Sequence, residues 1–546
     1  MSLLARVAWY DVRVAQSTRE RSIWAWGWRD RFPDEAARTG LSQLVRVLLP
    51  KAQPAARPAP SDEPRVPATP IGVPDALAGF ASQAPRDRAM RARGRAFPDL
   101  VVGFAGDYTQ APDIVACPRD AAEVSQVLEQ CDARGWACVP FGGGTSVVGG
   151  VDAALARGER AAVVTLDLGA LTGVREVDST SRLARIAAGT LGPVLEDELG
   201  THGLTLRHYP QSFEFSTLGG WLATRAGGHY ATGPTRIDEL AHSLTMITPR
   251  GALETHRHPG SGAGPEPARL VLGSEGALGV ITEAWMRVVP RPRWRATANV
   301  AFEDFDAGVA AARALAQSGL YPSNARLLDA NEARLHRVRF DGTSVLLIGF
   351  ESADHPLGPW LARAVELARD HGGEVVSGPS ETDTASRTGE AGAWRQAFFD
   401  APYLQSALLS IGVLSDTFET ACSWSQFPAL HDKVVTAVQR ALDAECGGGL
   451  VSCRFTHVYP DGPAPYYTFV GALRVGGELA QWRTLKAAAS DALASAGGTI
   501  THHHAVGRTH RPWYDRERPP LFAEALRAVK RELDPRGILN PGVLLD

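Results

Sequence analysis

Three consecutive histidines, His502, His503 and His504, are the residues with the clearest capacity for chemistry in this sequence. Imidazole titrates near neutral pH, so a neutral histidine can take a proton from a reacting group and return it. The run lies between a segment expected to be a strand and Ala505. Because neighbouring side chains of a strand point to opposite faces, we expect at most two of the three to share one site.

A first glycine cluster could bind phosphate. It reads Pro140, Phe141, Gly142, Gly143, Gly144, Thr145 and Ser146. Consecutive glycines allow backbone N–H groups to converge on phosphate oxygens, and the two hydroxyls can add donors. The cluster is neither a GxGxxG fingerprint nor a P-loop, because Gly150 stands where the P-loop lysine would be.

Two further clusters follow in the chain. Residues 210–228 read PQSFEFSTLGGWLATRAGG, and residues 272–282 read LGSEGALGVIT. In the third cluster, small residues lead into a β-branched strand, which allows backbone to lie against a flat ring. Three such clusters in this order favour a site for one extended ligand that carries both phosphate and a ring.

Together these segments resemble the FAD-binding proteins of the vanillyl-alcohol-oxidase and p-cresol-methylhydroxylase type over residues 100–546. The resemblance implies an α+β fold in which a two-subdomain PCMH-type FAD-binding domain clamps an extended FAD. An α/β substrate domain would cap the flavin. Some relatives tether the flavin through a histidine in the first glycine cluster; Phe141 stands there in this chain, so the FAD is expected to be noncovalent.

Within that group the sequence most resembles the alkyldihydroxyacetonephosphate synthases. The resemblance is carried by FEFSTLGGWLATRAGG, TPRG, GSEGALGVITEA, ARLLD, SCR and GGTITHHHAVG, and by the aromatic segment WAWGWRD. It implies that the following residues line the FAD: the first cluster, Pro140, Phe141, Gly142, Gly143, Gly144, Thr145 and Ser146; the second, Gln211, Ser212, Phe213, Glu214, Phe215, Ser216, Thr217, Thr224, Arg225, Ala226 and Gly227; and the third, Glu275, Gly276, Ala277, Leu278, Gly279, Val280 and Ile281.

The same resemblance implies the catalytic residues: Tyr466, His502, His503, His504 and Arg326. Arg454 and Gln405 would bind substrate. Gln405 is a departure, because the synthases carry an arginine there that grips the substrate's phosphate; Arg395 is the nearest upstream arginine. Gln211 also departs, standing where the synthases have an aspartate.

The elements that must position these residues can be read from the pattern. Residues 114–116, an amphipathic segment from 118 to 131 and residues 136–140 predict a strand–helix–strand unit that runs into the first glycine cluster. We divide the chain into an N-terminal extension (1–97) with a proline-rich linker (50–74), an FAD domain (98–292), a cap domain (293–500) and a segment returning to the flavin (501–546).

The composition of the chain limits the classes of function and the kinds of partner that the protein can have. A net charge of −4 without a basic stripe argues against nucleic-acid binding. The six cysteines form no CxxC pair, so we expect free thiols and no metal site. No apolar run is long enough to cross a bilayer, and we expect a cytoplasmic protein. Peripheral membrane contact through residues 41–49 stays open, and a homodimer is expected by analogy.

The resemblance implies an FAD-dependent synthase of ether-lipid synthesis. It would exchange the acyl group of acyl-dihydroxyacetone phosphate for a fatty alcohol, with no net redox change. The alternative is an FAD-linked oxidase or dehydrogenase of a 2-hydroxy acid or alcohol. In that case a histidine would remove the hydroxyl proton, and Arg326 or Arg454 would hold a carboxylate.

Overall fold

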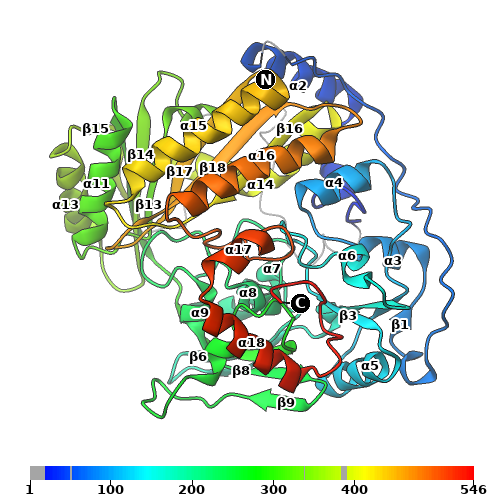
Figure 1. The fold of residues 1–546 in the computed structure, drawn as a ribbon. Coiled ribbons are helices and arrows are strands. Elements are labelled where there is room, and N and C mark those ends of the chain that lie inside the picture. Colours follow the sequence, from blue (N-terminus) through cyan, green and yellow to red (C-terminus); the bar gives the residue numbers. More distant parts are fainter. Residues whose placement is uncertain (1–18, 50–51, 337, 383–389, 546) are drawn as a thin grey trace.

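The computed structural model describes residues 19–49, 52–336, 338–382 and 390–545. It has two bodies, joined along one side by an extended segment near the N-terminus (Figure 1). One body carries the three glycine clusters and the other is built on one large sheet. The arrangement is the α+β fold with a separate cap that the sequence predicted.

The first FAD subdomain is a four-stranded sheet in the order β1-β2-β4-β3. Its strands are β1 (Ala81–Ser82), β2 (Ile114–Ala116), β3 (Ala137–Phe141) and β4 (Val163–Asp167), with helices α5 (Ala121–Arg134) and α6 (Ala153–Arg157). Strands β2, β4 and β3 are parallel, so the predicted strand–helix–strand unit is present with β4 inserted between its strands. Strand β1, which precedes the predicted boundary at residue 98, pairs with β2 and so joins this sheet.

The second FAD subdomain is a five-stranded antiparallel sheet in the order β5-β6-β10-β8-β9. These strands are β5 (Val174–Asp178), β6 (Leu183–Ala187), β8 (Ala241–Thr248), β9 (Gly251–Glu254) and β10 (Val280–Arg287). One face packs on a core formed with α7 (Gly192–Gly200), α8 (Leu218–Thr224), α9 (Ile237–Leu240) and α10 (Pro267–Val271). A two-stranded ladder, β7 (Leu204–Thr205) with β11 (Val289–Pro290), lies beside it.

The cap is a seven-stranded antiparallel sheet in the order β15-β12-β14-β13-β17-β18-β16. Its strands are β12 (Trp294–Phe302), β13 (Asn324–Leu328), β14 (Ser344–Ser352), β15 (Glu374–Thr382), β16 (Val413–Glu419), β17 (Gly449–Val458) and β18 (Pro463–Ala472). Four helices cover one face: α11 (Phe305–Gln317), α13 (Gly358–Arg369), α15 (Phe427–Cys446) and α16 (Glu478–Ser495). Two others, α12 (Ala330–Leu335) and α14 (Glu390–Ser410), complete the domain.

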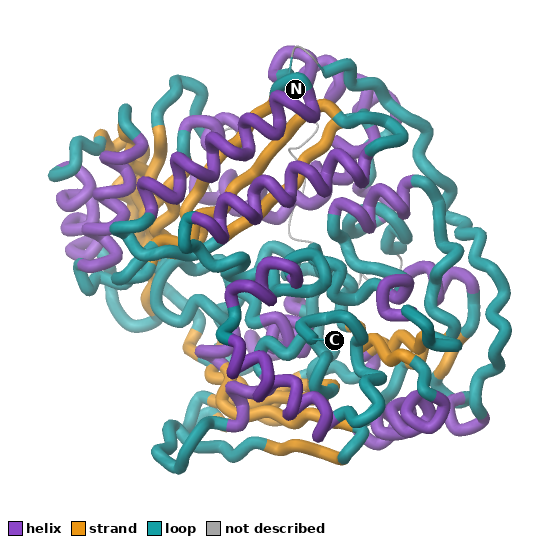
Figure 2. Tube along the Cα trace, in the orientation of Figure 1, coloured by secondary structure: helices purple, strands orange, loops and turns teal. Residues whose placement is uncertain are grey.

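Segments outside these sheets tie the bodies together. Near the N-terminus lie α2 (Glu35–Leu48), α3 (Pro85–Met90) and α4 (Phe97–Phe104), and at the other end α17 (Arg511–Glu517) and α18 (Pro520–Leu533). The tube view shows the predicted proline-rich linker as an extended loop along the outside (Figure 2). The C-terminal segment returns to the FAD body, where Val543, Leu544 and Leu545 are buried in the second subdomain's core.

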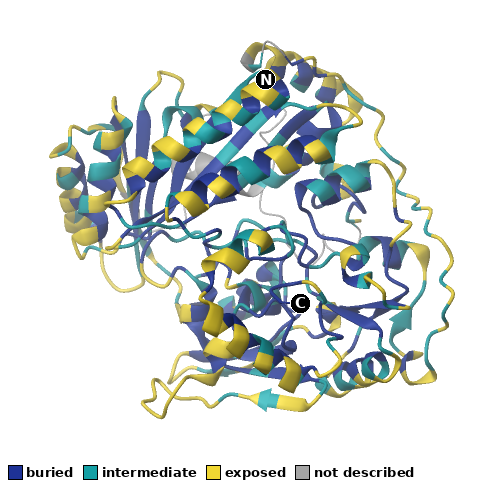
Figure 3. Ribbon diagram, in the orientation of Figure 1, coloured by how far each residue is buried: buried dark blue, intermediate teal, exposed yellow. Residues whose placement is uncertain are grey.

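In both bodies the strands are largely buried, and the outer faces of the helices are exposed (Figure 3). Among the described residues, no helix combines the length and the apolar composition needed to cross a membrane. The described cysteines are all free thiols.

Candidate functional site

The cap sheet presents a row of polar side chains on the face that its covering helices leave open. Residues 453 and 467 belong to the core under the helices, so strand alternation turns their neighbours Arg454 and Tyr466 to the opposite face. Tyr466 pairs with Arg454 on one side and with Glu419 on the other. One row across β17, β18 and β16 therefore carries a cation, a phenol and a carboxylate.

Arg454 is held in this row by a buried carboxylate. Its guanidinium forms an ion pair with Glu332 of α12 and lies over the Tyr466 ring, 3.9 Å from the ring centroid. Ser452 Oγ donates to the other Glu332 oxygen at 2.5 Å. The Arg454 charge holds the pKa of Glu332 well below its ordinary value in spite of burial. Arg454 is thus largely neutralised by its own partner.

Arg326 lies on β13 beside this row and is 1% exposed. One terminal nitrogen donates to the His229 carbonyl at 3.0 Å, and the other lies 3.3 Å from His229 Nδ1. Burial, and then the nearby Arg454, lower the pKa of Arg326 to about 9. With this pKa it is still a cation at neutral pH.

The three histidines lie in a loop, so the strand geometry behind the expectation that at most two of them share a site does not apply. Residues 501–507, the histidine loop, contain no strand. The chain bends because Thr501 Oγ accepts from the His504 N–H at 3.2 Å and because Glu419 accepts from the backbone of all three histidines. The bend overrides the alternation expected of a strand. The rings of His503 and His504 both lie against Tyr466, with centroids 5.8 and 5.4 Å away.

His457 is a fourth histidine at the site, which sequence reasoning missed. A register shift between Phe455 and His457 acts as a bulge, which re-aims a side chain. It brings the His457 ring to 4.9 Å from that of His502. Nothing in the sequence pattern indicates this bulge.

Hydrogen bonds hold these imidazoles in place. His457 Nε2 lies 3.1 Å from the Gly228 carbonyl oxygen, and His502 Nε2 lies 2.8 Å from the Tyr459 hydroxyl. His502 Nδ1 and His503 Nδ1 are 3.2 Å apart. The nitrogens of His457, His502 and His503 are close enough to one another to hold a metal ion. However, these hydrogen bonds already use several of them, and we interpret the cluster as a route for protons.

Burial keeps these histidines neutral. It lowers the pKa of His502 to about 3 and those of His457, His503 and His504 below their ordinary value, while the Glu419 carboxylate opposes the shift for all three loop histidines. Burial also raises the pKa of Tyr466, whose hydroxyl donates to Thr417 Oγ at 2.9 Å. At neutral pH the site therefore offers proton-accepting imidazoles beside a protonated phenol.

The three glycine clusters meet in the FAD body. A Cβ at Gly143 would lie 1.6 Å from the Phe215 carbonyl oxygen, and one at Gly142 would lie 2.3 Å from Thr217 Oγ. The Glu275 N–H donates to the Ala223 carbonyl at 2.8 Å, which joins the second and third clusters. The glycines are thus required for contact between clusters. In the third cluster the side chains of Ala277, Leu278, Val280 and Ile281 are core residues, so only their backbone could face a ligand.

Two arginines contact the backbone of the first cluster and of the segment just after it. Arg21 donates to the Gly143 carbonyl at 3.0 Å and Arg508 donates to the Gly149 carbonyl at 2.7 Å. Burial, followed by the charges of Arg95 and Arg91, lowers the pKa of Arg21 to about 9. In the described part of the chain, Arg21 Nε, Arg508 Nε and Ser274 Oγ are buried without a hydrogen-bond partner. A surplus of buried donors fits an anionic ligand such as the pyrophosphate of FAD.

The histidines beside the polar row lie against the second glycine cluster. A Cβ at Gly227, near the end of that cluster, would lie 3.1 Å from both His457 Cε1 and His503 Cβ. Of the predicted catalytic residues, Tyr466, Arg326 and the three histidines are brought together, with Arg454 beside them. Tyr467 points into the core, where its hydroxyl lies 3.2 Å from His431 Nδ1.

Gln405 lies on α14 at the sheet edge. Its amide donates to the Ser415 carbonyl at 3.0 Å and approaches Asp416 Oδ1 at 3.5 Å. These contacts use its donors, so its predicted role at a substrate phosphate stays a prediction. The side chain of Arg395 is outside the described residues.

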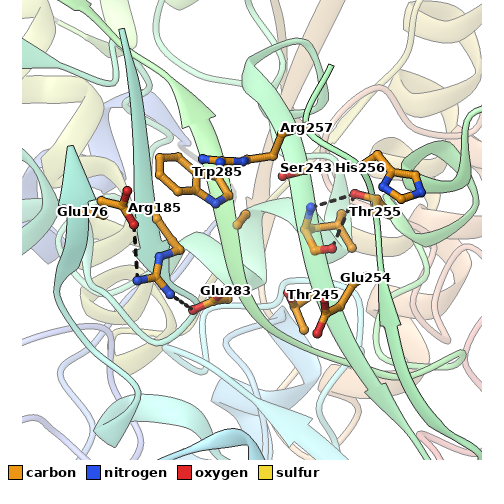
Figure 4. Close-up of a pocket in the computed structure, with 12 residues that line it drawn as sticks. Glu176, Arg185, Ser243, Thr245, Glu254, Thr255, His256, Arg257, Glu283 and Trp285 are labelled. Carbon is orange, nitrogen blue, oxygen red and sulfur yellow. Dashed lines mark hydrogen bonds and ion pairs between the residues drawn. The ribbon is translucent and has the colours of Figure 1, made fainter. Parts of the chain in front are cut away.

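A hollow of about 420 Å³ lies elsewhere, on the outer face of the second FAD sheet (Figure 4). Arg185 in this hollow lies 3.5 Å from both Glu176 and Glu283, and Arg257 lies over the Trp285 ring. It contains none of the predicted site residues.

Comparison with known proteins agrees with this geometry. Residues 112–256 match the family described as FAD binding domain, and residues 291–544 match FAD linked oxidases, C-terminal domain. The chain is 30% identical to alkyldihydroxyacetonephosphate synthase of Dictyostelium discoideum over 83% of this chain and 76% of that protein. It is 29% identical to the Caenorhabditis elegans synthase over 86% and 81%. A solved structure of alkyldihydroxyacetonephosphate synthase superposes with a TM-score of 0.73 at 26% identity, covering 89% of each chain.

Proposed function

The chain belongs to the alkyldihydroxyacetonephosphate synthase family of FAD-linked proteins, and from that premise we propose that it exchanges the acyl group of acyl-dihydroxyacetone phosphate for a fatty alcohol. FAD is its cofactor. When bound, the flavin supplies the reactive ring of an exchange that involves no net redox change. The protein supplies binding, orientation and proton transfer.

One observation carries this proposal. Tyr466 of the polar row, the neutral histidines and the charged Arg326 form a buried group that lies against the glycine clusters. An exchange of acyl for alkyl needs a base for the alcohol proton and a cation for an anionic substrate. This group contains both a base and a cation, and its burial excludes water that would compete with the alcohol.

We assign the roles as follows. His503, neutral and stacked beside Tyr466, accepts the proton of the attacking alcohol. The Tyr466 hydroxyl, which donates to Thr417 in the resting arrangement, is placed to donate to a reacting oxygen. His502, whose Nδ1 lies 3.2 Å from that of His503, extends the path by which a proton can leave. The ring of His457 packs beside that of His502.

Arg326 is the proposed site for the substrate's negative charge. Arg454 is neutralised by Glu332, and Gln405 is neutral and engaged with β16. A guanidinium suits phosphate because it can donate two parallel hydrogen bonds. We assign this role to Arg326, a cation that is buried beside the same row.

A second candidate function is oxidation of a 2-hydroxy acid or alcohol. It is supported by the match of residues 291–544 to FAD linked oxidases. The same parts would serve, with a neutral histidine taking the hydroxyl proton and Arg326 holding a carboxylate.

Two expectations extend the proposal to surfaces. Peripheral membrane contact is supported by α2, where Leu44 is 45% and Val47 76% exposed, since a lipid substrate must be met at a surface. The homodimer rests on analogy and is checked by light scattering.

The row can be tested with neighbouring tyrosines. Tyr466→Phe should keep FAD bound and lose exchange activity by roughly 10²–10⁴-fold, the scale of lost acid–base catalysis. Tyr467→Phe is the matched control, because its hydroxyl lies on the core side of the same strand. Equal activity in the two variants would remove Tyr466 from the mechanism.

A further inference from the structure

Glu419 is a buried carboxylate at the end of β16 that no sequence motif singled out. It is 1% exposed and pairs across the sheet with Tyr466. Because Phe418 belongs to the core under the helices, strand alternation turns Glu419 to the open face of the sheet. It therefore reaches the histidine loop from the cap.

The contacts of Glu419 are made with the backbone of that loop. Its two oxygens accept from the N–H groups of His502 at 2.6 Å, His503 at 3.1 Å and His504 at 3.0 Å. The Thr501 hydroxyl adds a donor at 2.6 Å. Three successive N–H groups converging on one anion form a nest, and here the anion is the protein's own side chain.

We propose that Glu419 is a positioning residue that presents His502, His503 and His504 to the reacting groups. Glu275, from the FAD body, holds the other end of the histidine loop by accepting from Val506 N–H at 2.9 Å and Gly507 N–H at 2.8 Å. The histidine loop is thus held at both ends by a buried carboxyl group, that of Glu419 from the cap and that of Glu275 from the FAD body. This inference rests on the proposed function only in assigning the histidines to the reaction.

Glu419 also acts on the charge of the rings it positions. Its oxygens lie 3.5 Å from His503 Nδ1 and 3.7 Å from His504 Nδ1. The other charged or titratable groups facing His503 are Arg236, Arg326, Arg454, His457, His502, His504 and Tyr466. The three arginines disfavour a protonated ring, and Glu419 is the carboxylate that opposes them.

The decisive variant is Glu419→Gln. The amide has the same shape, but its NH₂ end faces an N–H donor and the charge is lost. We expect FAD content to be unchanged, kcat to fall by roughly 100-fold because the rings shift, and KM to change far less. The acid limb of the kcat profile should move to lower pH, since the ring loses the charge that favours its protonation. Backbone amides of residues 502–504 should exchange hydrogen faster.

Glu517→Gln is the matched control. Glu517 makes the same kind of contact just upstream, accepting from Thr499 Oγ at 2.6 Å and Ile500 N–H at 2.8 Å, but it does not touch the histidines. It should leave kcat and the pH profile as in the wild type. Thr501→Val, which removes one donor to Glu419, gives a milder loss and carries the test if Glu419→Gln does not fold.

Wild-type kcat in Glu419→Gln, or unchanged amide exchange at residues 502–504, would overturn the inference. So would an equal loss in Glu517→Gln. If the wild type itself shows no alkyl-for-acyl exchange, the proposed function fails, and amide exchange still tests the positioning role by itself.

Discussion

Adding a single methyl group at Gly143 should weaken the binding of FAD. The ideal Cβ of that residue lies 1.6 Å from the Phe215 carbonyl oxygen, whereas ordinary contact begins near 3.4 Å. The first two glycine clusters must therefore separate in Gly143→Ala. The obstacle is backbone, which cannot rotate away as a side chain can.

The size of the effect follows from the cost of overpacking, typically about 1–3 kcal/mol. If binding FAD requires the clusters to return to contact, this energy is taken from the binding free energy. The FAD dissociation constant should then rise by roughly 5–150-fold.

The assay is titration of the FAD-free protein with FAD, followed by flavin fluorescence, with thermal unfolding measured in parallel. Gly262→Ala is the control, because a Cβ there meets nothing within 4 Å. A Gly143→Ala protein that binds FAD as tightly as Gly262→Ala would show that contact between the clusters does not form the flavin site.

Further outcomes are expected. With Phe141 at the position where some relatives tether the flavin, acid or heat should release intact FAD into the supernatant; flavin remaining on the denatured chain would contradict this. The free energy of unfolding should fall as the pH drops below about 6.5. Burial lowers the pKa of His502 to about 3 in the folded protein, so between these two pH values the histidine binds a proton only in the unfolded chain. The loss is roughly 1.4 kcal/mol per pH unit for each such histidine. A urea midpoint that stays constant from pH 7 to pH 4 would refute it. Gln405→Arg should leave the KM of a phosphate-bearing substrate unchanged, because Asp416 lies beside the side chain; a lower KM would instead place residue 405 at the phosphate.

Local patterns predicted the parts of this protein that depend on nearby residues. The helix at residues 121–134 follows from its capping aspartate, Asp120, and its apolar spacing. The glycine clusters could be recognised in the sequence because a close approach of two backbone segments requires glycine. The sequence therefore predicted the loop after β3 and the start of β10.

The histidine loop could not be predicted in the same way. Its conformation is set by Glu419, 83 residues from His502 in the sequence, and its position by Glu275, more than 200 residues away. His457 faces the site only because of a bulge in β17. Such long-range hydrogen bonds leave no periodicity in the sequence, so the alternation of a strand was the wrong basis for expecting at most two of residues 502–504 to share a site.

Arg21 illustrates the same limit. It comes from the N-terminal extension yet donates to Gly143, 122 residues later. A solitary arginine ahead of an aromatic segment has no spacing that signals contact with a phosphate-binding loop. The N-terminal extension thus contributes a contact to the first glycine cluster.

The most direct test of the account uses the wild-type holoenzyme without oxygen. It is mixed with acyl-dihydroxyacetone phosphate and an isotope-labelled long-chain alcohol while the flavin absorbance is recorded. We expect labelled ether product and free fatty acid in equal amounts, with the oxidised flavin spectrum restored at the end. No labelled product with this pair, together with lasting bleaching of the flavin by a 2-hydroxy acid, would contradict the account and establish the oxidase alternative.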